Sequence, residues 1–418
     1  MSRRVLMICY HYPPVAGSSG YQRTLNFARH LPEHGWEPLV LTVHPRAYPQ
    51  TGPQEGAPEG PQVVRAFALD SSRHLAFRGR YPAVLAWPDR WISWWLGAVP
   101  GSSRIVREFD PDVIWSTYPI ATAHLIGSSW ARRLRKPWVA DFRDPMSEDN
   151  YPSALQGRLV RQIERATVQR TSRIVVTTDG AGTEIASRYP KLVRPRSFIT
   201  IPNGFDEDAF QSAERLAPPA RRPGDPLELV HSGILYPAER DPRAFFQALS
   251  ELFAAGELRS DELRVRLRAT AHDDLYRPII QSLALPSCVF LEPPVPYVQA
   301  LAEMLAADAL LLFQGSICNN QVPAKAYEYL RARRPVLALT DPLGDTARLL
   351  QSSGLTRICP LDSVAAIKSE IVTLIQDIRG ARVELPSREV IARFDRRYQT
   401  RVLAGVLDAA AGRSDPSG

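Results

Sequence analysis

Residues 5–43 read VLMICYHYPPVAGSSGYQRTLNFARHLPEHGWEPLVLTV, and their pattern is that of a strand, a loop, a helix and a second strand. The apolar runs at 5–10 and 37–43 have the length of buried strands. The segment between them has helical spacing up to Gly35, and glycine commonly ends a helix. A strand, a helix and a strand in succession form a βαβ unit, so this stretch predicts a parallel sheet with helices on both faces.

The same alternation continues along the rest of the chain. In the first half, the further expected strands are 112–117, 137–142, 173–178 and 197–202. In the second half, the expected strands are 228–233, 264–270, 288–294, 309–314 and 335–340. Between the two sets, the proline-rich stretch 215–226 has the composition of a linker. We therefore predict an α/β protein with two Rossmann-like, doubly wound parallel-sheet domains, at 1–205 and 206–388, and a final helix at 389–412.

The length and the composition are those of a globular protein with two domains. A chain of 418 residues is too long for one ordinary core. Its share of hydrophobic residues, 44%, and of charged residues, 23%, is typical of folded proteins. No stretch reaches the ~18 consecutive apolar residues that a membrane-spanning helix needs. We therefore expect a cytoplasmic protein that does not span a membrane.

The residues that bind metals in other proteins show no suitable spacing here. The four cysteines form no CxxC pair, which fits a reducing compartment and indicates neither a zinc site nor a disulfide framework. They are Cys9, Cys288, Cys318 and Cys359. Of the two D-x-D strings, the one at 110–112 precedes a strand and the one at 206–208 follows an Asn-Gly turn. We expect no metal and no cofactor.

Positive charge is concentrated in the first half of the chain. Residues 1–206 hold 26 Lys and Arg against 17 Asp and Glu, whereas the remainder holds 25 against 27. A basic half attracts nucleic acid, an anionic membrane face or a phosphate-bearing substrate. The chain has no helix-turn-helix, zinc-finger or RNP signature, so we expect no nucleic-acid partner.

Ligands of open α/β sheets bind outside the carboxyl ends of the strands, so the loops that follow strands are the candidate sites. The first of these loops, HYPPVAGSSGYQR (11–23), holds Gly17 and Gly20 at the entrance to a helix. Backbone N–H groups that remain free there can bind an anion or a sugar hydroxyl. The loop lacks the GxGxxG pattern of dinucleotide sites, and a plain strand-to-helix turn is the alternative.

The loop DFRDP (141–145) ends an apolar strand with three charges. Burying such charges without partners is costly. We therefore expect Arg143 and Asp144 to lie at the ligand-binding edge and Asp141 to be structural. The alternative is an internal Asp–Arg pair that only shapes the loop.

The loop HSGILYPAERDP (231–242) places Gly233 after the first strand of the second domain and Arg240 just before a helix. A guanidinium in this position can bind phosphate oxygens with two parallel hydrogen bonds. The alternative is a solvated arginine next to Glu239 and Asp241.

The stretch VPAKAYEYLRARRPVLAL (322–339) begins a helix with Pro323, which suits the first helical position. Lys325 lies in the first turn, where a cation opposes the helix dipole, and an anion bound at the same place would offset this cost. Glu328 lies on the same helix face and can accept hydrogen bonds from two ribose hydroxyls. The alternative is an i, i+3 ion pair on a surface helix.

Aromatic residues and histidines supply two further expectations. We expect the four tryptophans near Asp89 and Arg90 to lie in the core, with an acceptor-binding or membrane-facing surface as the alternative. They are Trp87, Trp91, Trp94 and Trp95. We also expect His124 in the core and His231 near the ligand-binding edge.

Taken together, these loops resemble a GT-B glycosyltransferase of the retaining family 4, over nearly the whole chain. The motifs are YHYPPVAGSSGYQR (10–23), PWVADFRDP (137–145), IPNGFD (201–206), HSGILY with RDP (231–242) and VPAKAYEYLRARRPVLAL (322–339). The resemblance implies two Rossmann-like domains that face a cleft. The N-terminal domain would take the acceptor and the C-terminal domain a nucleotide-activated sugar, and the final helix would cross back to the N-terminal domain.

Several site residues follow from positions that match the family motifs. Glu328 matches the glutamate that holds the donor ribose, and Arg240 matches the basic position that neutralises the diphosphate leaving group. Gly17 and Gly20 match the glycine loop near the donor phosphates and the acceptor.

Three positions depart from the family pattern. Asn320 stands where another glutamate near the sugar is frequent, which leaves the sugar contacts open. Ile234 stands where a second phosphate-binding arginine is usual, which makes Lys325 the replacement cation. Arg143 stands where many members have a histidine, and we expect it to form an acceptor-side polar cluster with Asp144.

The resemblance implies a retaining, metal-independent glycosyltransferase that moves a sugar from a nucleotide-sugar donor to a glycan or lipid-linked acceptor, in cell-surface polysaccharide or glycolipid assembly. The basic N-terminal half favours peripheral association with the inner face of the cytoplasmic membrane. Two alternatives stay open, a catalytically silent GT-B subunit that partners another glycosyltransferase and an enzyme of the nucleotide-sugar epimerase type. The expected catalytic residues are Arg143, Asp144 and Arg240. The expected donor-binding residues are Gly17, Gly20, Gly233, Arg240, Asn320, Lys325 and Glu328.

Overall fold

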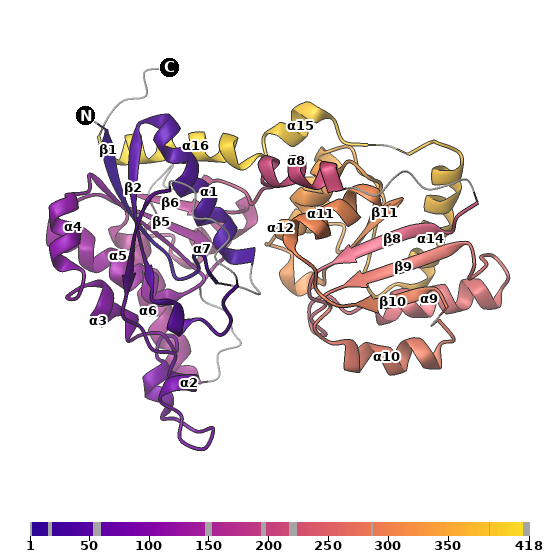
Figure 1. Ribbon diagram of the computed structural model, residues 1–418, viewed down its shortest axis with the longest axis horizontal. Coiled ribbons are helices and arrows are strands. Elements are labelled where there is room, and N and C mark those ends of the chain that lie inside the picture. Colours follow the sequence, from indigo (N-terminus) through magenta and orange to yellow (C-terminus); the bar gives the residue numbers. More distant parts are fainter. Residues whose placement is uncertain are drawn as a thin grey trace. The chain divides into compact units, whose positions relative to one another are not determined.

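The structure is a computed structural model that divides into two compact units, Met1–Pro202 with Arg396–Gly418, and Asn203–Asp395. It describes residues 2–15, 19–52, 60–146, 153–193, 198–216, 224–285, 287–383 and 385–412. Each unit is built on one parallel sheet with helices on both faces (Figure 1). In the described part of the chain, no helix is both long enough and apolar enough to span a membrane.

The first unit contains a seven-stranded parallel sheet whose strand order reverses between β1 and β4. In spatial order the strands are β3 (Gln62–Ala66), β2 (Trp36–Val43), β1 (Arg3–Ile8), β4 (Val113–Thr117), β5 (Trp138–Arg143), β6 (Arg173–Val176) and β7 (Phe198–Thr200). Such a reversal leaves a crevice outside the carboxyl ends of the strands, where ligands of doubly wound sheets bind.

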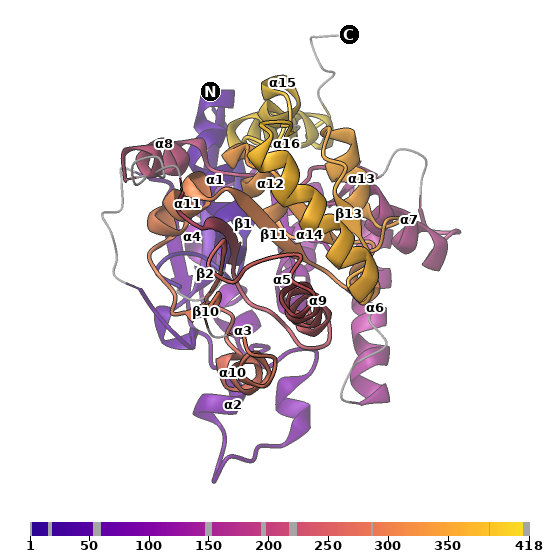
Figure 2. The ribbon, with the colours of Figure 1, turned by 90° about the vertical axis from the view of Figure 1, so that its right-hand side faces the viewer.

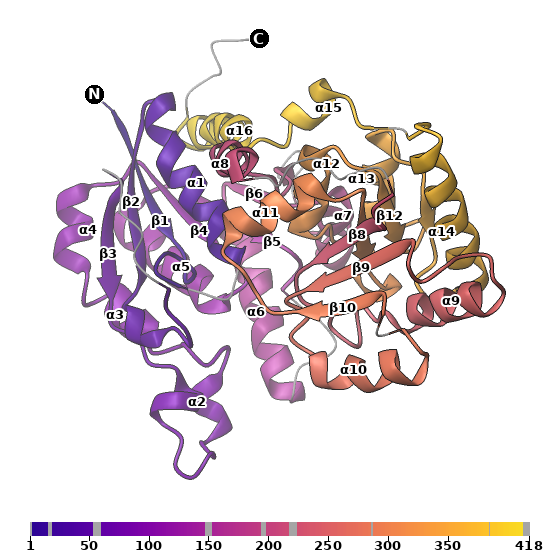
Figure 3. The same cartoon turned by 45° about the vertical axis from the view of Figure 1, so that its right-hand side comes forward.

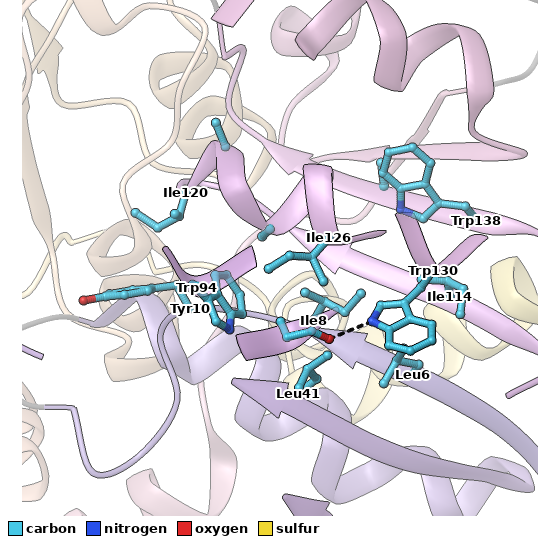
Figure 4. Packing of buried hydrophobic residues seen from close by; sticks show 14 of the residues in the cluster. Leu6, Ile8, Tyr10, Leu41, Trp94, Ile114, Ile120, Ile126, Trp130 and Trp138 are labelled. Atoms are coloured by element: carbon cyan, nitrogen blue, oxygen red, sulfur yellow. Dashed lines mark hydrogen bonds between the residues drawn. The ribbon is translucent and has the colours of Figure 1, made fainter. Parts of the chain in front are cut away.

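Both faces of this sheet are covered, which explains why β1 is apolar at every central position. Leu6 and Ile8 face a cluster that includes Trp130, whose Nε1 donates to the Ala98 carbonyl at 3.0 Å (Figure 4). This face is covered by α3 (Trp94–Ala98), α4 (Ser103–Phe109), α5 (Ala121–Leu134), α6 (Ala154–Arg170) and α7 (Asp179–Arg188). Val5 faces the opposite cluster, which is covered by α1 (Gln22–His30) and α16 (Arg396–Ala410).

The second unit repeats this arrangement with six parallel strands, and its order reverses between β8 and β11. In spatial order the strands are β10 (Val289–Glu292), β9 (Leu263–Arg268), β8 (Leu227–Ser232), β11 (Ala309–Phe313), β12 (Val336–Leu339) and β13 (Ile358–Cys359). One face packs against α9 (Arg243–Ala254), α10 (Asp273–Ser282) and α14 (Val364–Arg379) (Figures 2 and 3). The other face packs against α8 (Glu207–Leu216), α11 (Tyr297–Ala306), α12 (Ala324–Ala332), α13 (Asp345–Ser352) and α15 (Arg388–Ala392).

The predicted fold class, two doubly wound parallel-sheet domains, is confirmed. The segment expected as one helix over 389–412 is instead two helices, α15 and α16, separated near Phe394. The reason is local packing, because the Phe394 ring contacts Tyr327 and its carbonyl accepts from the Phe205 amide at 3.1 Å. Only α16 belongs to the first unit, where Trp36 Nε1 donates to Asp408 at 3.1 Å.

The short strands β3 and β13 and the half-buried Trp87 also differ from what the sequence predicted. Strand β3 was not expected, because its five residues follow a stretch that reads as a proline-rich loop.

Of the four clustered tryptophans, Trp94 is fully buried as expected, and Trp91 and Trp95 pack against the same core. Trp87 is half-buried.

A buried ion pair joins α1 to β5 in the first unit. The side chains of Arg23 and Asp141 are 1% and 0% exposed, and Arg23 Nε lies 2.7 Å from Asp141 Oδ2. A second donor, Nη2, reaches Oδ1 at 3.2 Å, and Thr117 also donates to this carboxylate at 3.2 Å. Arg23 Nη1 donates to the Pro202 carbonyl at 3.0 Å. The expected structural role of Asp141 agrees with this geometry, because burial of both charges is tolerable only with full pairing.

Replacing Asp141 with Asn leaves the Arg23 charge buried and uncompensated. We expect the free energy of unfolding of the first unit to fall by about 3–5 kcal/mol. All eight tryptophans of the chain lie within residues 1–202, so tryptophan fluorescence in urea reports the unfolding of this unit. The matched control is Arg104→Ala, which breaks an exposed i, i+4 pair with Glu108 and should cost less than ~0.5 kcal/mol. Equal midpoints for both variants would show that the buried pair does not stabilise the unit.

His124 in α5 is buried and neutral. Trp138 Nε1 donates to Ser116 Oγ at 2.8 Å, and Ser116 Oγ and His124 Nδ1 form a second hydrogen bond, also at 2.8 Å. Burial lowers the pKa of His124 from 6.5 to about 3. Because the unfolded chain takes up this proton more readily than the folded chain, the His124 contribution to stability decreases as the pH falls from 6.5 towards 3.

A His124→Gln variant keeps a hydrogen-bonding side chain near Ser116 but cannot take up the proton. Between pH 7 and pH 4 we expect the wild-type first unit to lose about 3 kcal/mol more stability than this variant, measured by tryptophan fluorescence in urea. Carboxylates and the other histidines titrate in both proteins, so only the difference between the two pH profiles is informative. Parallel profiles would contradict the assignment.

Candidate active site

The loop after β8 and the first turn of α12 meet at Gly233 and Lys325. Gly233 has a φ of +115°, and a Cβ added there would lie 2.9 Å from Lys325 Nζ. The backbone conformation therefore favours glycine here, and the lysine packs closely against it. Pro323 is the N-cap of α12, one position before the first helical residue, and its first turn contains no acidic residue.

His231 holds the lysine in this position. Its Nδ1 donates to the Leu311 carbonyl of β11 at 2.9 Å, which leaves Nε2 to accept from Lys325 Nζ at 3.1 Å. Burial, together with the nearby Lys325 charge, lowers the pKa of His231 well below its usual range. Sequence reasoning placed His231 near this edge without assigning it a role, and the available signal was a polar residue within an apolar strand.

Lys325 is held where its charge is disfavoured. Burial and, next, the Arg240 charge lower the pKa of Lys325 well below its usual range, whereas Glu328 acts in the opposite direction. An anion bound near Nζ would restore the charged form.

Arg240 lies in the loop that follows β8, and one of its buried hydrogen-bond donors has no partner among the described residues. Its guanidinium carbon lies 5.3 Å from the centre of the Tyr236 ring, and Nη1 donates to the Ile234 carbonyl at 3.4 Å. Its buried Nε has no hydrogen-bond partner among the described residues. A buried donor without an acceptor costs free energy, so this atom indicates a place for an anionic oxygen.

Glu328 lies one turn beyond Lys325 on α12, and Tyr297 donates to its Oε1 at 2.8 Å. This hydrogen bond orients the carboxylate. Directly after β11, the buried Gln314 holds the loop that leads to α12, because its Nε2 donates to the Cys318 and Gln321 carbonyls at 2.7 and 2.9 Å. The side chain of Asn320, in this loop, is exposed.

In the first unit, Arg143 and Asp144 follow the carboxyl end of β5. Arg143 has a φ of 59° at a register shift of the strand, and Asp144 N donates to the Phe142 carbonyl at 2.7 Å. Arg143 Nη1 donates to the Gly20 carbonyl at 3.1 Å, so the structure brings together two of the expected site residues. Gly17 lies outside the described residues.

Burial governs the protonation of this cluster. It raises the pKa of Asp144 above its usual range, against the opposing effect of Arg143. Burial and the Arg143 charge lower the pKa of His11, which follows β1, to about 4. Sequence reasoning missed His11, although it begins the first loop after a strand. The cluster therefore combines a guanidinium, a carboxyl group and a neutral imidazole.

Residues 20–204 match the family described as "Glycosyl transferase 4-like domain". A D-inositol 3-phosphate glycosyltransferase of Kineococcus radiotolerans is 28% identical over 188 residues, which are 40% of this chain and 42% of that protein. The match thus spans less than half the length of this curated relative.

Solved structures resemble the whole chain. Sucrose-phosphate synthase from Thermosynechococcus elongatus has a TM-score of 0.65 at 12% identity and covers 98% of this chain and 96% of its own. Anabaena Alr3699/HepE, in complex with UDP and glucose, has a TM-score of 0.65 at 16% identity and covers 97% and 100%. The chain therefore has the GT-B fold of these structural neighbours. Residues 20–204, within its first unit, are similar to the glycosyl transferase 4-like family, in agreement with the resemblance predicted from the motifs of this part of the chain.

Lys325 is one of only four lysines in the chain, which makes its titration measurable by competitive acetylation and mass spectrometry. Since the pKa of Lys325 is lowered, we expect its labelling midpoint to lie well below pH 10.5. The midpoint should rise in Arg240→Ala, which removes a neighbouring positive charge, and fall further in Glu328→Gln. The other three lysines calibrate the reagent in each sample. A midpoint unaffected by both substitutions would contradict the described electrostatic coupling.

Proposed function

We propose that the protein is a glycosyltransferase that moves a sugar from a nucleotide-sugar donor to a glycan or lipid-linked acceptor, with retention at the anomeric carbon and without a metal ion. The observation that carries the proposal is the anion-binding geometry of the second unit. Arg240, whose Nε has no partner among the described residues, and Lys325, packed on Gly233, lie at the carboxyl edge of the sheet. The GT-B fold and the UDP complex of the HepE neighbour support a nucleoside diphosphate as the anion.

The proposed chemistry uses these cations for the leaving group. As the glycosidic bond breaks, the nucleoside diphosphate gains negative charge, which Arg240, Lys325 and the N-terminal amides of α12 stabilise. Lys325 would become fully charged when the diphosphate binds. Glu328, oriented by Tyr297, would accept hydrogen bonds from the ribose hydroxyls. The acceptor hydroxyl then attacks from the face that the diphosphate leaves, and its proton passes to the departing diphosphate.

Other residues have supporting roles in this proposal. Gly233 allows the phosphates to approach the backbone, and Asn320 lies in the loop that would face the donor sugar. Arg143 and Asp144 would form the acceptor-side cluster of the first unit, and Gly17 and Gly20 would lie near the donor phosphates and the acceptor. We further propose a cytoplasmic enzyme of cell-surface polysaccharide or glycolipid assembly that associates peripherally with the inner membrane face.

Donor binding tests the site assignment. We expect Arg240→Ala to weaken the binding of a nucleoside diphosphate or its sugar by about 10–100-fold, because a charged hydrogen-bonding partner of the phosphates is lost. Glu328→Ala should also impair donor use, and the control Arg259→Ala, which breaks an exposed pair with Asp261, should not. Isothermal calorimetry with a panel of nucleotide sugars and assays of sugar transfer measure both effects.

The outcomes separate the alternatives. Wild-type transfer rates in both site variants would refute the assignment of the residues. A wild-type protein that binds no nucleotide or nucleotide sugar would favour a silent partner subunit. Release of an epimerised donor, or of free sugar, without an acceptor would favour an epimerase-type enzyme.

A further inference from the structure

Residues 71–88 of the first unit form a projection that the catalytic proposal does not use. The segment follows β3 and contains α2 (Ser71–His74), a two-residue hairpin and the short helix η4 (Ala83–Ala86). It extends away from the strands of its unit (Figures 1 and 3). Phe77 and Arg80 exchange backbone hydrogen bonds at 2.8 and 3.1 Å, and the turn between them has φ values of 51° at Arg78 and 76° at Gly79. Two positive φ values in a two-residue loop define a compact hairpin turn.

This projection exposes large apolar side chains. Phe77 is 77% exposed and Val84 is 59% exposed. Leu75 and Leu85 are exposed as well. Single exposed apolar residues are common on protein surfaces, but a group of them on one projecting segment marks an interaction site.

The charge of the projection indicates the kind of partner. Residues 71–88, SSRHLAFRGRYPAVLAWP, contain three arginines and no aspartate or glutamate. A hollow of about 590 Å³ is lined by Phe77, Arg78, Arg80, Tyr81 and Pro82. Guanidinium groups next to aromatic rings match the boundary of an anionic membrane, where headgroup phosphates lie above the acyl chains. A second copy of the same surface would carry the same positive charge and be repelled.

The base of the projection is held by buried hydrogen bonds. Ser71 Oγ lies within hydrogen-bonding distance of two carbonyls, those of Leu85 at 2.5 Å and Arg90 at 3.0 Å. Asp70 is fully buried and accepts from the Ser72 amide at 3.0 Å. The exposed tip is therefore presented by a fixed base, and binding does not have to order the whole segment.

We propose that residues 71–88 dock the protein on an anionic lipid bilayer. Phe77 and Val84 enter the boundary between headgroups and acyl chains, and Arg78 and Arg80 contact lipid phosphates. The inference deepens the proposed function and rests on it for the biological setting, because a lipid-linked acceptor lies at a membrane. The docking itself requires neither donor nor transfer, so it can be tested separately.

The test is co-sedimentation of the full-length chain with vesicles of phosphatidylcholine, with and without phosphatidylglycerol. We expect binding only to the anionic vesicles and a loss of binding as the salt concentration rises. The variant Arg78→Asn/Arg80→Gln, in which asparagine tolerates the positive φ, should partition about 10–30-fold more weakly. Phe77→Ser/Val84→Ser should also weaken binding at least ~10-fold. The control Ile105→Ser replaces an exposed apolar residue of α4 and should bind normally.

Tryptophan fluorescence in urea, which reports the first unit, confirms that each variant is folded. Wild-type binding by both double variants, or no binding of the wild type to anionic vesicles, would overturn the proposal. A dimer that Phe77→Ser/Val84→Ser dissociates, together with unchanged vesicle binding, would assign the surface to a second copy instead. Nucleotide binding measured by calorimetry should be the same in all these variants, so failure of docking and failure of the proposed function are distinguishable.

Discussion

Burial of both faces of each parallel sheet is the constraint on which the rest of this structure depends. Strands such as β1 must be apolar at their central positions, because helices cover both of their faces. Polar groups within the sheet layer are tolerated only when paired, as Arg23 and Asp141 are. Chemistry is therefore confined to the carboxyl ends of the strands. In each unit the candidate residues lie in the segments that follow the carboxyl ends of the strands. The strand order reverses between β1 and β4 in the first unit and between β8 and β11 in the second.

At the carboxyl edge of its sheet, the second unit holds charged and polar groups in unfavourable electrostatic surroundings. Lys325 is partly buried next to another cation, and its hydrogen-bond partner is a histidine that burial keeps neutral. Arg240 retains a buried donor that no described residue satisfies. An arrangement that costs free energy without a ligand becomes favourable when an anion is bound. This is why the same residues are more readily explained as a binding site than as a stabilising cluster.

In the first unit, three groups of residues near the carboxyl edge of the sheet differ in their contacts and exposure. Arg23 and Asp141 fix α1 against the sheet, whereas Arg143, two residues beyond Asp141, reaches the Gly20 carbonyl from a strained backbone position. Residues 71–88 leave the same sheet after β3 and expose a basic and apolar tip. A single stretch of sequence can thus supply a structural carboxylate and a candidate catalytic pair, because the register shift between Asp141 and Arg143 and the positive φ of Arg143 interrupt the regular alternation of the strand.

The sequence by itself determined the fold class, the positions of most strands along the chain, and the segments that hold Gly233, Arg240, Lys325 and Glu328, because these depend on local periodicity and on short motifs. The tertiary structure alone decided which groups meet. Three features depend on how residues far apart in the chain pack. They are the hydrogen bond from Lys325 to His231, the lack of a partner for Arg240 Nε within the described part of the chain, and the exposure of Phe77. The break before α16 has the same cause, since the packing of Phe394 on Tyr327 overrides a continuous helical pattern.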